Sequence, residues 1–375
     1  MNKKIFLLFF AGLCVIALCS CAGCVGTPDA GDGTINITDA FGRVVTVPDN
    51  PDKIAVSGSG SMRYFIYLDA VDRVVAVDYT DTYTSNTEGR PYMLARPDIQ
   101  NISAVGGAKS VVDVEKLLTS GAEVIFMGGA SSSSVEIANE IQEKSGIPVV
   151  MFYVGNYVTK GEEIRDTFRM IGEILHKEER AEELITYFDS VEADLKSRVA
   201  DVPDEDKQTV YIAGISYQGA HGATGTDPTY YPFTVLDAKN VVTGVDETAQ
   251  TGYAEIAKEQ LLEWDPDIIF VDLGTLSAAN GGVLYELAND PSYQELTAVK
   301  TGQIYTVNPH TWANVNHETT LVNAYYIGKV LYPEQFADIN LTVKANEIYS
   351  FVDGAPVYEQ MNENREGLSY QKIEL

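Results

Sequence analysis

Short apolar segments with the composition of β-strands alternate with helical segments along most of the chain, and a long helical stretch interrupts this alternation near its middle. Such alternation is typical of α/β domains with mainly parallel sheets, because a helix returns the chain between parallel strands. We therefore expect an α/β region, a long helix and a second α/β region. The strand candidates are Ile35–Thr38, Val44–Val47, Lys53–Ser57, Val74–Asp78, Val124–Met127, Val149–Tyr153, Thr209–Ala213, Ile268–Val271 and Gln303–Val307. The helix candidates between the early strands are Met62–Leu68, Val112–Thr119 and Ser133–Ser145.

The interrupting stretch contains two sets of apolar residues at helical spacing, and each set forms one face of an amphipathic helix. The segment His176–Glu178 separates the two helices, and Pro203 ends the second. These boundaries predict a first lobe over residues 34–158, a linker helix over 159–177 and a second lobe over 178–375. The two sets are Ile164, Phe168, Ile171 and Leu175, and Ala181, Leu184, Phe188, Val191 and Leu195.

Residues 115–126 and 259–270 are related by an internal repeat. Both segments read Glu-x-Leu-Leu-x4-acid-aliphatic-Ile-Phe without gaps. Each is expected to form a short helix, a turn and a buried strand, with the Leu pair packed on a sheet. The repeat indicates that the two α/β regions are structurally related.

The N-terminus has the layout of an export signal. Lys3 and Lys4 precede an apolar run from Ile5 to Cys19, which is shorter than the roughly 20 residues that a membrane-spanning helix needs. All four cysteines of the chain lie within its first 24 residues. Cysteines directly after such a run indicate lipid attachment, and Cys21 and Cys24 are the candidates. The alternative is a plain signal peptide whose cysteines have no function.

The composition narrows the function classes. Residues 25–33 lack periodicity and are expected to form a tether after a signal peptide over residues 1–24. The net charge of −28 repels nucleic acid and anionic lipid surfaces, so neither is an expected partner. Lipid attachment would therefore be the only membrane contact, on the outer face of the cell membrane.

Sequence motifs for catalysis are incomplete in this chain. Leu321 stands where a zinc-protease helix starting at His317 requires a second His, and Gln218 stands where a nucleophile elbow requires Gly. No metal-ligand spacing joins the four histidines, and no cofactor or metal site is expected. A binding protein is therefore the preferred class. The rival class is an exported hydrolase that would use His221 with a nearby acid such as Asp227.

Several segments, in the right order over most of residues 35–335, resemble the substrate-binding proteins of ABC importers for iron-siderophores, haem and cobalamin. Residues 336–375 extend past this pattern, and the sequence assigns them no role. The segments are Ile37–Pro48, Pro51–Val56, Leu68–Val77, Val105–Gly106 leading to Glu115, Asp265–Ile269 and Ala298–Val307.

The resemblance implies two Rossmann-like lobes joined by one long α-helix, with the ligand held in a cleft between them. It also implies a permease partner, because each lobe of such proteins presents a surface Glu to Arg residues of the permease. The matching positions are Glu115 and Glu259, the first residues of the internal repeat. The alternative is that each Glu only complements the dipole of its own helix.

Ligands of open α/β sheets bind beyond the carboxyl ends of the strands. The corresponding loops of this chain are rich in aromatic residues, which suit a ring-bearing ligand, and they carry arginines, which pair with carboxylate or phosphate. His221 lies on a glycine-rich loop and is a candidate donor or metal ligand. The ligand-binding candidates are Arg63, Tyr79, Tyr83, Arg90, Tyr92, Tyr153, Tyr217, His221, Tyr231 and Trp312.

Among metal-containing ligands, the sequence favours a ferric siderophore-type chelate over a corrinoid, with haem third. Many ferric chelates are anionic, so binding one to this acidic chain would require a positive patch from Arg63 and Arg90. A corrinoid would need a wide aromatic cleft with few charges. Haem would need an axial ligand such as His221.

Overall fold

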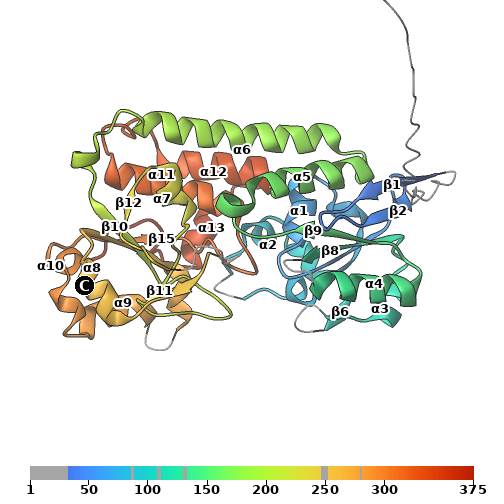
Figure 1. Ribbon diagram of the computed structural model, residues 1–375, viewed down its shortest axis with the longest axis horizontal. Coiled ribbons are helices and arrows are strands. Elements are labelled where there is room, and N and C mark those ends of the chain that lie inside the picture. The colour runs from blue at the N-terminus through green and yellow to red at the C-terminus, as the bar shows by residue number, and fades with distance from the viewer. Residues whose placement is uncertain (1–32, 86–87, 108–110, 130–132, 246–251, 279–280) are drawn as a thin grey trace, which may run out of the picture.

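The structure is a computed structural model that describes residues 33–375, except 86–87, 108–110, 130–132, 246–251 and 279–280. It consists of two α/β lobes side by side, with a layer of long helices across one side of both (Figure 1). The expected α/β fold of two lobes is confirmed.

The first lobe is built on a parallel sheet with the strand order β5-β4-β3-β8-β9. Its central strands are buried along almost their whole length, as is usual for parallel strands covered on both faces. The strands of this lobe are β1 (Thr34–Thr38), β2 (Val44–Pro48), β3 (Ile54–Ser57), β4 (Val74–Val77), β5 (Ser103–Ala104), β6 (Gly106–Gly107), β7 (Val111–Val112), β8 (Val124–Gly129) and β9 (Val149–Tyr153). The helices are α1 (Met62–Tyr67), α2 (Pro91–Ala95), α3 (Val114–Ser120) and α4 (Ser133–Ser145), with 3-10 helices η1 (Val71–Arg73), η2 (Tyr79–Thr82) and η3 (Pro97–Asn101).

The second lobe repeats this plan with a parallel sheet of order β12-β10-β14-β15. Its strands are β10 (Thr209–Ala213), β11 (Gly225–Thr226), β12 (Lys239–Asn240), β13 (Ala254–Glu255), β14 (Ile268–Asp272) and β15 (Ile304–Val307). Its helices are α7 (Tyr231–Val235), α8 (Lys258–Trp264), α9 (Gly282–Asn289), α10 (Thr297–Lys300) and α11 (His317–Leu331), with 3-10 helices η5 (Asp204–Asp206), η6 (Leu273–Ser277) and η8 (Tyr293–Glu295). The internal repeat forms α3 with β8 in the first lobe and α8 with β14 in the second.

The two sheets are connected by a pair of antiparallel helices. α5 (Tyr157–Leu175) follows β9 and packs beside it, and α6 (Glu178–Val199) returns along the length of the molecule (Figure 1). His176 ends α5 in the left-handed conformation, with φ of 52°, at the break expected from the sequence. α6 contacts the second lobe through α7 and α11 and reaches the first lobe through Arg180, which donates to the Tyr67 carbonyl at 2.8 Å.

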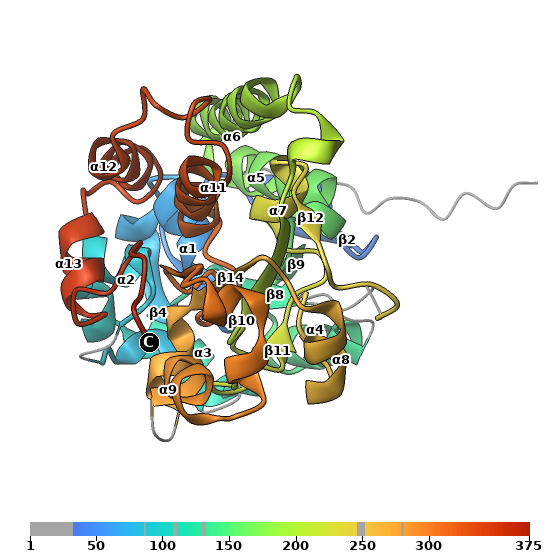
Figure 2. The same cartoon turned by 90° about the vertical axis from the view of Figure 1, so that its left-hand side faces the viewer.

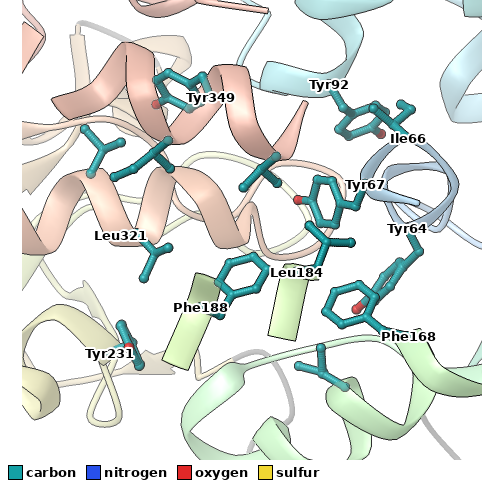
Figure 3. Close-up of a cluster of buried hydrophobic side chains, with 14 of the residues drawn as sticks. Tyr64, Ile66, Tyr67, Tyr92, Phe168, Leu184, Phe188, Tyr231, Leu321 and Tyr349 are labelled. Atoms are coloured by element: carbon teal, nitrogen blue, oxygen red, sulfur yellow. The ribbon is translucent and has the colours of Figure 1, made fainter. Parts of the chain in front are cut away.

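A single aromatic core joins the helices of both lobes (Figure 3). Tyr64 of α1 lies 5.6 Å from Phe168 of α5, and Phe168 stacks on Phe188 of α6 at 6.2 Å between ring centroids. Exposing one such side chain costs about 2–3 kcal/mol. The lobes are therefore held together at the helical layer.

Residues 336–375, which the sequence left without a role, cross both lobes. They form α12 (Leu341–Val352), α13 (Tyr358–Glu363) and a final extended segment. α13 lies beside α2 of the first lobe (Figures 1 and 2), and Asn364 donates to the Glu88 carbonyl at 3.2 Å. The last residues pair with the edge strand β15 of the second lobe through Ile373, whose N–H donates to the Ile304 carbonyl at 2.8 Å.

Candidate ligand-binding cavity between the lobes

A cavity of about 500 Å³ lies where loops from both lobes meet. One loop follows β3 of the first lobe, and three follow β10, β14 and β15 of the second. These are carboxyl ends of parallel strands, where α/β sheets bind ligands. The lining residues are Ser59, Ser216, Tyr217, Gln218, Gly219, Ala220, Ser277, Thr311, Trp312, Ala313 and Asn314.

The side chains of this lining are uncharged. Four of them carry aliphatic hydroxyl groups, from Ser59, Ser216, Ser277 and Thr311, and two carry amides. Tyr217 and Trp312 add aromatic surface. The lining therefore offers neutral hydroxyl and amide groups and ring faces, which suit a ligand rich in oxygen acceptors. One of these hydroxyls, Ser277 Oγ, already donates to the Gly274 carbonyl at 3.0 Å.

Tyr217 forms one wall of the cavity and is supported from behind by other rings. It stacks on Tyr253, with 5.0 Å between ring centroids. His221 Nε2 lies 2.8 Å from the Tyr217 carbonyl oxygen, and His221 Nδ1 lies 2.9 Å from Tyr253 Oη. Both ring nitrogens of His221 are thus engaged inside the protein, so this residue supports Tyr217 and does not line the cavity.

Trp312 forms a second wall from a tight turn after β15. Thr311 pairs with Val315, and the Trp312 N–H donates to the Asn314 carbonyl at 2.9 Å. Ala313 and Asn314 both have positive φ, of 48° and 73°. Left-handed backbone at a residue such as Ala is unfavourable and tends to occur at functional sites.

Arg63 lies behind this turn and not in the cavity lining. It is 1% exposed, and its Nη2 donates to the Ala313 carbonyl at 2.9 Å and to Asn316 Oδ1 at 3.0 Å. Nη1 donates to the Val315 carbonyl. The guanidinium is thereby committed to joining α1 of the first lobe to the Trp312 loop of the second.

Arg90 and Tyr92 are also buried, in an ionic cluster of the first lobe. Arg90 pairs with Glu88, with Nε 2.7 Å from Oε1, and with Asp81 at 3.2 Å. The Tyr92 hydroxyl donates to Asp81 at 2.8 Å. Burial raises the pKa of Asp81 to about 6, although the Arg90 charge acts to lower it. The positive patch expected from Arg63 and Arg90 does not form part of the cavity lining.

The other aromatic candidates lie away from this cavity. Tyr79 and Tyr83 are exposed on the first lobe, with their rings 5.7 Å apart. Tyr153 packs against Phe41 at 4.7 Å. Tyr231 lines a separate cavity of about 410 Å³ between α5, α6 and α7. Of the ten candidates, the structure brings Tyr217 and Trp312 into the cavity and places His221 and Arg63 directly behind its walls.

Sequence reasoning missed the hydroxyl groups of the lining. Ser59, Ser216 and Thr311 each lie a few residues after a buried strand. This position after a strand is the one sequence signal that could have identified them. Serine and threonine are so common in loops that position alone does not distinguish them from solvated residues.

The loop that carries Trp312 rests on a buried charge cluster. His310 lies 3.4 Å from Asp272 and 3.5 Å from Asp227. Burial lowers the pKa of His310, but the two carboxylates outweigh burial and raise it to about 9. Asp227, the example of a nearby acid for His221 in the hydrolase alternative, pairs instead with His310, and both are buried under this loop. The acid beside His221 is Glu255, whose Oε2 lies 3.5 Å from His221 Nδ1.

Glu115 and Glu259 are exposed residues at the N-terminal turns of α3 and α8. These helices belong to different lobes and lie on the side of the molecule away from α6 (Figures 1 and 2). Asp113 caps α3 by accepting from the Glu115 N–H at 2.9 Å, so the Glu115 side chain is not needed as the cap.

Neither a metal cluster nor a membrane-spanning helix occurs in the part of the chain that the structure describes. No group of three or more His, Cys, Asp or Glu among these residues could hold a metal ion. None of their helices is long and apolar enough to cross a membrane. The candidate lipidation residues Cys21 and Cys24 lie outside the described residues.

Curated relatives cover most of the chain at low identity. The molybdate-binding protein MolA of Haemophilus influenzae is 24% identical over 334 residues, covering 84% of this chain and 89% of MolA. The ABC transporter substrate-binding lipoprotein YvrC of Bacillus subtilis is 23% identical over 305 residues, covering 79% of this chain and 88% of YvrC. The Fe(3+)-citrate-binding protein YfmC of Bacillus subtilis is 28% identical over 153 residues, covering 40% of this chain and 44% of YfmC.

Solved structures share the fold. A periplasmic solute-binding protein from Veillonella parvula superposes with a TM-score of 0.67 at 20% identity, covering 88% of this chain and 96% of that one. The molybdate-bound MolA of Haemophilus influenzae also superposes with a TM-score of 0.67, at 21% identity, covering 86% of this chain and 98% of MolA.

A family model described as periplasmic binding protein matches residues 54–311, which include all strands of both parallel sheets and three of the four loops around the cavity in full. Proteins of this family bind solutes for ABC transporters and are not enzymes. The chain therefore belongs to the periplasmic binding protein family and is the substrate-binding component of an ABC transporter.

Proposed function

We propose that this protein captures an oxygen-rich metal chelate of low net charge, of the ferric siderophore type, in the cavity between its lobes. It then delivers the chelate to the permease of an ABC importer. The observation behind this proposal is the lining itself: four aliphatic hydroxyl groups and two aromatic walls, with no charged side chain among the lining residues.

The size and charge of the cavity support this class of ligand. A volume of about 500 Å³ lies within the range of roughly 300–1,000 Å³ for sites that hold drug-sized molecules. The chain has a net charge of −28, and the cavity lining adds no cation to attract a highly charged anion. A neutral hydroxamate-type chelate avoids this repulsion, and its oxygen atoms accept hydrogen bonds from the hydroxyl groups.

Molybdate is the second candidate. The relative MolA is described as a molybdate-binding protein, and hydroxyl groups are suitable donors to an oxyanion. A small dianion would, however, leave much of the cavity empty and would meet no lining cation. A corrinoid suits the low charge of the lining, and haem is disfavoured because both ring nitrogens of His221 have partners.

Calorimetric titration of the purified protein with ferrichrome, sodium molybdate, cyanocobalamin and haemin separates these ligands. Ferrichrome should bind with a micromolar or lower Kd, and the others at least tenfold more weakly. The Tyr217→Ala variant should lose ferrichrome affinity, whereas Tyr285→Ala, which removes another exposed Tyr that lies outside the lining, should not. Tight binding of molybdate with none of ferrichrome would refute the chelate proposal.

Docking to the permease is proposed to use Glu115 and Glu259. Both carboxylates are exposed, one in each lobe, and both stand where a helix N-terminus favours an anion. Exposed charges of this kind mainly set the orientation and rate of association.

Attachment to the outer face of the cell membrane is proposed to occur through a lipid on Cys21 or Cys24, with residues 25–33 as the tether. The similarity to YvrC, which is described as a lipoprotein, supports this anchor.

A further inference from the structure

Trp312 is contacted by two arginines from distant parts of the chain, one at its backbone and one at its indole ring. Arg63 binds the backbone of the Trp312 turn from the first lobe, as described above. On the other side, the guanidinium carbon of Arg365 lies 4.8 Å from the centre of the Trp312 ring. The lining residue is thus fixed through its backbone by one cation and through its ring by the other.

Arg365 is buried without the hydrogen bonds that a guanidinium normally makes. It is 1% exposed, and its Nε and Nη2 have no hydrogen-bond partner among the described residues. The nearby carboxylates are occupied elsewhere, since Glu88 pairs with Arg90 and Asp272 accepts from the Gly274 N–H at 2.8 Å. Burial accordingly lowers the pKa of Arg365 to about 10. The indole face of Trp312 compensates part of this burial, because a desolvated cation is attracted to such a face more strongly than an exposed one.

The segment that presents Arg365 is tied to the same loop. Ser369 Oγ donates to Asn308 Oδ1 at 2.6 Å, and the neighbouring Asn364 reaches the Glu88 carbonyl of the first lobe. These contacts fix the chain on both sides of Arg365. Both Trp312 and Arg365 lie beyond residue 311, where the match to the family model ends.

We propose that Arg365 is a positioning residue of the binding cavity, which holds the Trp312 indole as one of its walls and so makes the C-terminal segment part of the binding site. This inference rests on the proposed function for the identity of the ligand, but the packing of Trp312 can be tested without any ligand.

The test uses the fluorescence of Trp312 in the ligand-free protein. The chain has two tryptophans, so Trp264→Phe leaves Trp312 as the sole tryptophan. In this background, Arg365→Met should make Trp312 more accessible to acrylamide quenching and shift its emission. Arg365→Lys, which keeps a cation, should restore part of the wild-type signal. Lys372→Met is the matched control, because Lys372 lies 5.7 Å from the Tyr305 ring in the same C-terminal segment but away from Trp312.

A second variant approaches the same pair from the first lobe. A Cβ at Gly89 would overlap Arg365 Nη2 and would lie 2.9 Å from Trp312 Cδ2, so Gly89→Ala should also raise Trp312 quenching even if Arg365→Met does not fold. Ferrichrome affinity should fall about tenfold in Arg365→Met and in Gly89→Ala. Wild-type Trp312 quenching in Gly89→Ala, and in Arg365→Met where that variant folds, would overturn the proposal. Failure of the unmodified protein to bind ferrichrome would instead refute the proposed ligand class. The quenching result would still report on the packing of Trp312 by Arg365.

Discussion

The guanidinium of Arg63 donates a hydrogen bond to the side-chain oxygen of Asn316 at 3.0 Å, and this contact joins the two lobes directly behind the cavity. Asn316 in turn donates to the Gly89 carbonyl at 3.1 Å, so both partners bridge the same lobe boundary. The arginine that the sequence assigned to the ligand is thus part of the joint between the lobes.

Replacing Arg63 by Met should destabilise the fold by about 3–5 kcal/mol, because it leaves buried carbonyl groups and Asn316 without their donor. Urea unfolding measures this loss. Arg96→Met is the control, since Arg96 makes partly exposed ion pairs that contribute less than about 1 kcal/mol. Similar unfolding midpoints for the two variants would contradict a joint that depends on Arg63.

Gly60 should tolerate no side chain. Its Cβ would overlap the carbonyl oxygen of Ala313 across the lobe boundary, so Gly60→Ala should push the Trp312 turn away from the first lobe and weaken ligand binding. Gly42→Ala is a matched control with nearly the same φ, 78° against 73°, and no atom within 4 Å of the added Cβ. Both variants lose about 1 kcal/mol of folding stability because Ala disfavours a positive φ. Only Gly60→Ala should lose more stability than this. Equal melting temperatures would show that the lobes adjust freely here.

Stability should depend on pH through His310. Its folded-state pKa of about 9 exceeds the ordinary value of 6.5, so the protonated ring stabilises the fold fully below about pH 6.5. This contribution, about 3 kcal/mol from the difference in pKa, is lost as the pH rises through 9. Chemical unfolding at pH 6, 7.5 and 9 should show the decline, and His310→Gln should flatten it. A wild-type curve as flat as that of the variant would exclude a protonated His310.

Joint replacement of Glu115 and Glu259 by Ala should leave ligand affinity within about twofold and reduce ligand-driven stimulation of the reconstituted importer. The control pair is Glu136→Ala with Glu263→Ala, which removes exposed carboxylates from the same two lobes. Wild-type stimulation by the first pair would disprove the assignment of these residues to docking.

Changing both Cys21 and Cys24 to Ser should release the protein from membranes without altering its fold. Fractionation in the absence of detergent measures the release, and circular dichroism of the released protein checks the fold. If the double variant still requires detergent for extraction, the anchor is a different one.

The class of fold and the family could be predicted from the sequence alone. Strand positions can be read from apolar runs such as Val124–Met127 because burial of a parallel strand is encoded locally, residue by residue. The internal repeat located α3 with β8 and α8 with β14 for the same reason. The loops that surround the cavity also followed from the sequence, since they begin where those strands end.

Which loop residues face the cavity depends on how the chain packs. Arg63 and Arg90 are polar residues on loops or short helices, and nothing local distinguishes a cation that awaits a ligand from one that binds distant partners. The partners of Arg63 lie about 250 positions away, in the turn that carries Trp312. The contact of Arg365 with Trp312 is equally invisible in the local sequence, because it depends on how the C-terminal segment crosses both lobes. Long-range pairing of this kind is a property of the packed chain, so it is absent from any local sequence pattern.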